Sequence, residues 1–146
     1  MKSPAPYIEM AVEAGKRVLQ YTPETEDEFQ RSLIMQDAIC MRLQEMGENL
    51  SKFRQHFPDF YEAHHSDDWH RLIGLRNAIS HGYGEIDMHI VWRIVSTELQ
   101  QVVDALARLN HSEHARLSQW ACGVNYLDVL ASDFKTLSKR SSLLRG

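Results

Sequence analysis

The clearest helical pattern in the chain lies in ICMRLQEMGENLSKF, residues 39–53. Its apolar side chains recur at steps of four and three residues, which places them on one face of an α-helix. These side chains are Ile39, Leu43, Met46, Leu50 and Phe53. The pattern ends before Pro58, so we expect one long helix that packs this face against other helices.

A second amphipathic helix is expected upstream, over residues 7–21. Its apolar residues also recur at three- and four-residue steps, and the pattern stops at Thr22-Pro23. The acidic run Glu24–Glu28 follows. We interpret this run as a linker that leads into the long helix.

A third helix is predicted downstream of the long one, over residues 69–81. Between Pro58 and Asp68 the chain is rich in Asp and His, which predicts a loop. The carboxylate of Asp68 is placed to cap the helix that follows.

Two glycines, Gly82 and Gly84, end the third helix on either side of Tyr83, where they let the backbone turn tightly. Asp87 is expected to cap a fourth helix whose apolar face extends to Leu109. No stretch shows the alternating pattern of a half-buried strand. The predicted fold class is therefore all-α, an antiparallel four-helix bundle.

The C-terminal residues 112–146 differ from the rest in charge. We assign residues 1–111 to the helical domain and residues 112–146 to an extension that forms an additional helix or a tail. After Asp133 every charged residue of the extension is basic. A solvated helix end, with its cations favoured by the helix dipole, explains this pattern. Docking on RNA or on an acidic partner is the alternative.

The composition sets limits on the class of protein. The chain of 146 residues is 43% hydrophobic and 25% charged, as expected of one compact domain. Its net charge of -4 argues against a protein that coats nucleic acid without specificity. It has no apolar run long enough to span a membrane and no secretory signal at its start, so a cytoplasmic location is expected. Its two cysteines, Cys40 and Cys122, are expected to be reduced, and buried or inert.

The densest group of polar side chains lies in RNAISHGY, residues 76–83. Asn77 and His81 are four residues apart and share a helical face, and Arg76 lies one position around the helix from Asn77, from where it can point into the same cleft. An imidazole exchanges protons near neutral pH, and a guanidinium holds phosphate oxygens with a fork of donors. Together these groups suit cleavage of a phosphodiester bond.

Such a cleavage needs no metal ion. A base removes the proton of a ribose 2′-hydroxyl, that oxygen attacks the adjacent phosphate, and arginine stabilises the added negative charge. One histidine and one arginine per chain are few for this reaction, but a twofold dimer would place two copies of each in one cleft. A structural role for the pair near a helix end is the alternative that the spacing leaves open.

The stretch from Arg76 to Tyr83 matches the signature R-x-x-x-x-H-x-Y. In this the chain resembles the HepT-like toxins of the HEPN superfamily, which are paired with minimal nucleotidyltransferase antitoxins of the MntA type. The resemblance extends from about residue 7 to residue 109. The other segments that carry it are Gln36-Asp37-Ala38, Leu43, Met46-Gly47-Glu48, Trp69, Ile73-Gly74-Leu75, Ile86-Asp87 and Ile90-Val91-Trp92.

The resemblance implies a homodimer that cleaves RNA as an endoribonuclease without a metal or another cofactor. Arg76 and His81 would be the catalytic pair, with Asn77 in support. Tyr83 would be the residue to which the antitoxin transfers AMP, and this transfer silences the toxin. Such a pair is a type VII-like toxin–antitoxin system. The family usually has a bulky residue after the tyrosine, where this chain has Gly84.

Two other functional classes stay open. A non-catalytic HEPN domain that binds substrate or nucleotide for a nucleotidyltransferase would use Arg76 and His81 to hold phosphate without cleaving it. A purely structural dimer module is the third class. Cleavage of RNA without added metal, and its loss in His81→Ala, separates the enzyme from both.

Acidic residues of the long helix have two interpretations. Asp37, Glu45 and Glu48 could act as acid–base groups or as Mg²⁺ ligands. Because they lie away from the apolar stripe, we interpret them as a solvated face.

A cluster of histidines also has two interpretations. The spacing of His64, His65 and His70 matches no standard zinc site, and no cysteine lies nearby, so we expect surface histidines. The tryptophans are expected to be core anchors, although aromatic rings of this size could also stack on bases.

Overall fold

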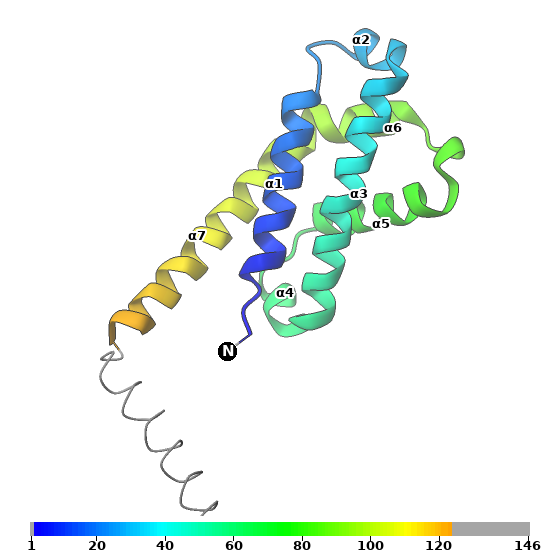
Figure 1. Ribbon diagram of the computed structural model, residues 1–146. Helices are drawn as coiled ribbons and strands as arrows, with labels where there is room; N and C mark the ends of the chain where they lie inside the picture. Colours follow the sequence, from blue (N-terminus) through cyan, green and yellow to red (C-terminus); the bar gives the residue numbers. More distant parts are fainter. Residues whose placement is uncertain (1, 124–146) are drawn as a thin grey trace, which may run out of the picture. The chain divides into compact units, whose positions relative to one another are not determined.

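The computed structural model describes residues 2–123, and the side chains of these residues as far as Ser118. Within this range every regular element is helical, so the predicted all-α class is confirmed (Figure 1). The elements are α1 (Ala5–Tyr21), α2 (Glu26–Arg31), α3 (Leu33–His56), α4 (Pro58–His64), α5 (Asp67–Gly82), the 3-10 turn η1 (Tyr83–Glu85), α6 (Met88–Arg93), the π-helical turn η2 (Ile94–Glu98) and α7 (Leu99–Gly123). The contacts divide the chain after Asn110, and the bundle described below belongs to the first unit.

The four expected helices correspond to α1, α3, α5 and the segment α6–η2–α7. Helix α1 packs along α3 in the opposite direction (Figure 1), and α3 also contacts α5. The apolar face predicted for α3 is buried: none of Ile39, Leu43, Met46, Leu50 and Phe53 has any exposed surface. Burial of a side chain of this size contributes about 1.5–3 kcal/mol, so this one face supplies a large share of the stability.

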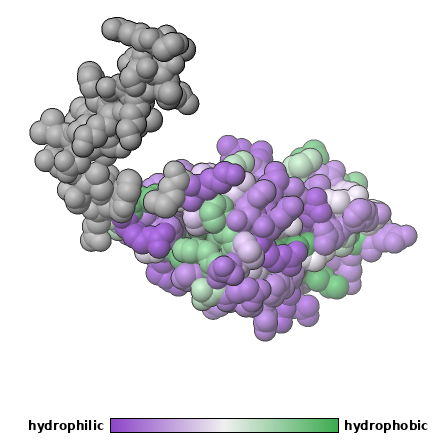
Figure 2. Space-filling model, turned by 90° about the horizontal axis from the view of Figure 1, so that it is seen from below, coloured by the Kyte–Doolittle hydropathy of each residue, from purple (hydrophilic) through white to green (hydrophobic). Residues whose placement is uncertain are grey.

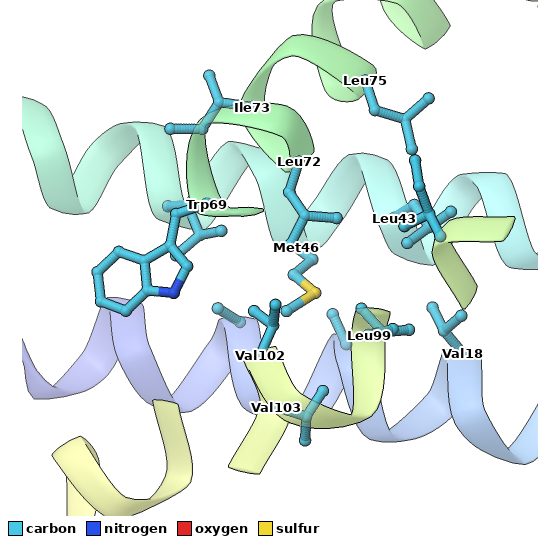
Figure 3. Packing of buried hydrophobic residues seen from close by; sticks show 14 of the residues in the cluster. Val18, Leu43, Met46, Trp69, Leu72, Ile73, Leu75, Leu99, Val102 and Val103 are labelled. Carbon is cyan, nitrogen blue, oxygen red and sulfur yellow. The ribbon is translucent and has the colours of Figure 1, made fainter. Parts of the chain in front are cut away.

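The core lies between α1, α3, α5 and the beginning of α7. Figure 3 shows Met46 of α3 between Leu72 of α5 and Val102 of α7. Trp69 is 3% exposed and belongs to the same core, and the ring of Trp92 packs on Phe29 at 5.7 Å between centroids. These two tryptophans anchor the core as predicted. The side chain of the third tryptophan lies outside the described residues.

Two short helices replace segments that we predicted as linker and loop. Helix α2 covers most of the acidic run, because the side chain of Thr25 caps it by accepting a hydrogen bond from the backbone N–H of Glu28 at 3.3 Å. The acidic residues of its first turn favour the positive end of the helix dipole. The linker interpretation is therefore wrong for residues 26–28.

The expected loop after Pro58 contains helix α4, which starts with this proline at a position where a missing N–H costs nothing. Helix α5 then starts two residues earlier than predicted, at Asp67, with Ser66 in the cap position. Asp68 therefore does not cap the helix. It lies in the first turn, where its carboxylate is 3.5 Å from the guanidinium of Arg71.

The fourth helix begins as predicted, because the side chain of Asp87 accepts a hydrogen bond from the backbone N–H of His89 at 2.9 Å. It is not one continuous α-helix, however. The π-helical turn η2 separates α6 from α7, and Ile94 and Val95 in this turn are buried. The extra residue in the turn shifts the register, so that side chains before and after it both reach the core.

The described part of the extension is the end of α7, as far as Gly123. The basic positions after Asp133 and the Cys122 side chain lie outside the described residues, and the boundary at residue 111 stays a prediction. On the face shown in Figure 2, hydrophilic residues predominate and hydrophobic ones form small patches. Between residues 2 and 123 no helix combines the length and the apolar character needed to cross a bilayer.

Candidate active site

Arg76 lies on the side of α5 that faces α3. Its Cβ approaches Gly47 so closely that a Cβ at this glycine would lie 2.5 Å from it. The guanidinium is held at both ends: Nη2 is 2.6 Å from Oε2 of Glu48, and Nη1 donates a hydrogen bond of 2.8 Å to Oδ1 of Asn77. The side chain keeps 29% of its surface exposed. The guanidinium is thus oriented by α3 and still open to solvent.

Tyr83 also reaches α3, from the first position of η1. Its hydroxyl donates a hydrogen bond to Oδ1 of Asp37, and the residue is 37% exposed. Partial burial raises the pKa of the Tyr83 phenol, and the hydrogen bond to Asp37 raises it further. Burial also raises the pKa of the nearby Cys40 thiol to about 11. Both groups therefore carry their protons at neutral pH, and Cys40 is buried as predicted.

One stripe of α3 contacts one stripe of α5 and η1, and we call these contacts the α3 support. Because residue numbers rise along α3 while those of the partners fall, the two helices run in opposite directions. The pairs are Asp37 with Tyr83, Gln44 with Ser80 at 3.1 Å, and Glu48 with Arg76. The α3 support therefore orients the first and the last residue of the motif.

His81 lies on a different side of α5 from Arg76. It is exposed and lines a groove of about 1080 Å³ between α5 and the segment from η1 to η2. The small residues Gly74 and Ala78 lie on the α5 wall of this groove. Its lining carries charges of both signs, from two arginines and three carboxylates: Arg71, Arg93, Glu85, Asp87 and Glu98. Isoleucines from the opposite wall make part of it apolar: Ile86, Ile90 and Ile94.

The expected common cleft of Arg76 and His81 is not present within one chain. Residues five apart on an α-helix differ by about 140° around its axis. Arg76 accordingly faces α3 and is absent from the lining of the groove, whereas His81 is part of it. Asn77 lies between the two directions, and in the structure it contacts Arg76. That Arg76 and His81 act together stays a prediction.

The α3 carboxylates are open to solvent, as predicted, but two of the three also contact the motif. Asp37 and Glu48 contact Tyr83 and Arg76 of the motif, although both remain partly open to solvent. Glu45 pairs with Arg42 on its own helix at 2.6 Å. The signal that could have found the pair is the spacing, because eleven residues are three helical turns and place both carboxylates on one face.

The histidine cluster behaves as surface aromatic groups. His64 and His70 are exposed and His65 is partly buried. The rings of His65 and His70 meet edge to face at 4.8 Å, and His65 stacks on Tyr61. Among the residues that the structure describes, no three His, Cys, Asp or Glu side chains come together as possible ligands of a metal ion.

Comparison with known proteins agrees with this fold and motif. The family described as ribonuclease HepT-like matches residues 11–109. The chain therefore belongs to the HepT-like ribonuclease family.

Several curated relatives carry RNase in their names. "Putative RNase MJ1380" of Methanocaldococcus jannaschii is 27% identical over 92 residues, which are 62% of this chain and 82% of that protein. "Putative RNase TTE0752" of Caldanaerobacter subterraneus subsp. tengcongensis is 21% identical over 103 residues, 70% of this chain and 89% of that protein.

A longer relative is also found. "Gamma-glutamylcyclotransferase and putative RNase MJ0434" of Methanocaldococcus jannaschii is 21% identical over 122 residues, 80% of this chain. The chain spans about half of the length of that protein, 54%. No solved structure matches the chain.

Proposed function

We propose that the protein is the toxin of a type VII-like toxin–antitoxin system and cleaves RNA as an endonuclease without a metal ion. The observation that carries this proposal is the placement of the motif. Helix α5 presents an oriented, partly exposed Arg76 on one side and an exposed His81 on a large groove on another side. Membership in the HepT-like ribonuclease family supports a reaction on RNA.

The chemistry follows from the two side chains. An imidazole takes the proton of a ribose 2′-hydroxyl, whose oxygen then bonds to the adjacent phosphorus. The bond from phosphorus to the 5′-oxygen of the next nucleotide breaks, and that oxygen takes a proton from a second imidazole. The guanidinium of Arg76 would stabilise the additional negative charge on the phosphate oxygens.

A homodimer would supply the second imidazole for one phosphate. In one chain Arg76 and His81 point in directions about 140° apart, so a shared site is simplest when the groups come from two chains. The wall of the groove can accept a close neighbour, because nothing lies within 4 Å of the position where Gly74 would carry a Cβ. A twofold axis near the groove would pair His81 with its copy.

An MntA-type nucleotidyltransferase antitoxin would silence this toxin by transferring AMP to Tyr83. Tyr83 is accessible to a partner protein, since the residue is 37% exposed and has glycines on both sides. Added AMP would bring negative phosphate to the end of α5 that carries His81, where it would compete with the phosphates of RNA.

The test is a comparison of His81→Ala with His64→Ala, an exposed histidine on α4. Both purified chains are incubated with RNA in the presence of EDTA, and both are expressed in cells. We expect His81→Ala to lose at least a hundredfold in cleavage rate and to relieve growth arrest, because it removes the acid–base group. His64→Ala should cleave like the unchanged chain.

A non-catalytic role is the second candidate, and one observation favours it: Glu48 neutralises part of the Arg76 charge, and Arg76 does not line the groove. In that case the unchanged chain neither cleaves RNA nor arrests growth. It would instead bind nucleotide or RNA through His81 for a separate nucleotidyltransferase.

A further inference from the structure

The Asp37–Tyr83 pair joins two residues that are 46 positions apart in the sequence. The packing of α3 on α5 brings them together, and the phenol donates its hydrogen bond to the carboxylate. Asp37 is exposed, and Tyr83 is 37% exposed. The pair is therefore formed within one chain and can be reached by the active site of another protein.

The Tyr83 phenol is a weak nucleophile until it loses its proton. Burial and the contact with Asp37 raise the pKa of the phenol, so almost none of it is ionised at neutral pH. The Cys40 thiol beside it cannot take the proton, since its own pKa is raised to about 11 and it is already protonated. The Asp37 carboxylate is the group that touches the phenolic oxygen, and aspartates are ordinarily ionised at neutral pH.

We propose that Asp37 is the general base of Tyr83 and takes the phenolic proton when the Tyr83 oxygen attacks an electrophile. In the modification step, which rests on the proposed function, the electrophile is the α-phosphorus of ATP. The phenolic oxygen bonds to this phosphorus, and the bond from the phosphorus to the oxygen that bridges to the β-phosphate breaks. Pyrophosphate leaves with that electron pair, and Asp37 carries the proton until solvent removes it. The modified chain thus contributes a reacting group to its own silencing.

A general base leaves a signature in the pH dependence. With the base present, the rate is level over the pH range where the carboxylate is ionised. Without it, the reaction needs free phenolate, and the rate rises about tenfold per pH unit. The titratable groups around Tyr83 are Asp37 and Cys40 on α3, and His81 and Glu85 on its own segment. Asp37→Asn changes the first of these and keeps the other three.

The first experiment measures AMP transfer. The full chain, Asp37→Asn and the control Asp59→Asn, an exposed aspartate of α4, are each incubated with an MntA-type nucleotidyltransferase, ATP and Mg²⁺. Mass spectrometry of the intact chains over time gives the rate of AMP transfer. We expect Asp37→Asn to gain AMP at least tenfold more slowly at pH 7, whereas Asp59→Asn keeps the rate of the unchanged chain. Equal rates for all three chains would overturn the proposal, because the antitoxin would then supply the base.

The second experiment needs no antitoxin. N-acetylimidazole acetylates tyrosine oxygens, and peptide mass spectrometry gives the rate at each tyrosine from pH 6 to 8.5. Tyr21 is an internal control, because it is 37% exposed, as Tyr83 is. We expect a level rate at Tyr83 and a rising rate at Tyr21. In Asp37→Asn the Tyr83 rate should fall at least tenfold at pH 7 and then rise with pH as at Tyr21, while an unchanged Tyr21 rate shows that the variant is folded.

The two experiments separate the two proposals. If no AMP is added even to the unchanged chain but the acetylation behaves as expected, the proposed modification is wrong and the role of Asp37 is supported. If Asp37→Asn acetylates Tyr83 as fast as the unchanged chain or faster, the hydrogen bond only covers the hydroxyl. The proposal for Asp37 is then overturned, whatever the antitoxin does.

Discussion

At the scale of single residues, the partners of Arg76 define its role. Its ion pair with Glu48 is partly exposed, with 29% and 36% of the two side chains accessible, so its contribution to stability is small. The contact instead reduces the freedom of a long side chain. Glu48 is therefore best described as a positioning residue for the guanidinium that we place in the cleavage site.

Glu48→Gln tests this positioning. We expect the variant to unfold at nearly the same temperature but to cleave RNA several-fold more slowly, with kcat reduced more than KM is raised, because the guanidinium loses its fixed direction in the transition state. Initial rates and thermal unfolding measure the two effects.

The matched control is Glu45→Gln. Glu45 forms a pair of the same length with Arg42 on the same helix, and it is 37% exposed. Cleavage should be unchanged in this variant. If both variants lose the same activity, the effect is general to α3 carboxylates, and Glu48 has no special part in orienting Arg76.

At the scale of elements, α3 determines where the motif lies. Gly47 makes this possible, since a Cβ there would lie 2.7 Å from the backbone oxygen of Leu72 as well as 2.5 Å from Arg76 Cβ. Close packing of α3 on α5 at this glycine lets the side chains of α3 form the contacts of the α3 support with the motif. Gly47 thus shapes the site, although it has no side chain that could take part in the reaction.

Gly47→Ala should destabilise the fold by about 1–3 kcal/mol, because the added methyl group forces α5 away from α3. Denaturant unfolding measures this loss, and cleavage should fall with it as Arg76 moves. Gly74→Ala is the control, because it lies in the same helix pair but faces open space. There the better helix propensity of alanine should stabilise by up to about 1 kcal/mol. A neutral Gly47→Ala would contradict the close approach.

At the scale of the whole molecule, we propose that a second copy of the chain completes the site. The groove combines small residues on α5 with isoleucines from the opposite wall, and His81 lies on its lining. An apolar, partly charged groove of this kind can bury surface against a copy of itself, since a twofold interface repeats the same patch on both sides.

Ala78→Trp tests the dimer directly. Ala78 is exposed on the groove, so an indole there should block a second chain without disturbing the core. We expect sedimentation to show a dimer for the unchanged chain and a monomer for Ala78→Trp, with cleavage lost in the same variant. Ala63→Trp, at an exposed position of α4, should remain dimeric and active. A monomeric Ala78→Trp that still cleaves RNA at the full rate would show that one chain is sufficient.

Some elements of the fold could be predicted from the sequence and others could not. The apolar steps of α3 predicted a face that is wholly buried, and Asp87 predicted the start of α6. Helices α2 and α4 were missed because they are short and rest on caps and tertiary contacts more than on a repeating apolar pattern. The contacts of Asp37 and Glu48 with the motif cannot be predicted from periodicity, which shows which side of a helix is polar but not what packs there.

The all-helical class, the four main helices and the family resemblance follow from the sequence alone, because the apolar period and the motif are local patterns. Only the tertiary structure decided that Arg76 and Tyr83 contact α3, whereas His81 lines a separate groove. Contacts between residues tens of positions apart depend on which helix faces pack together and how closely. Those choices follow from the shape of the whole core and from a glycine at one crossing.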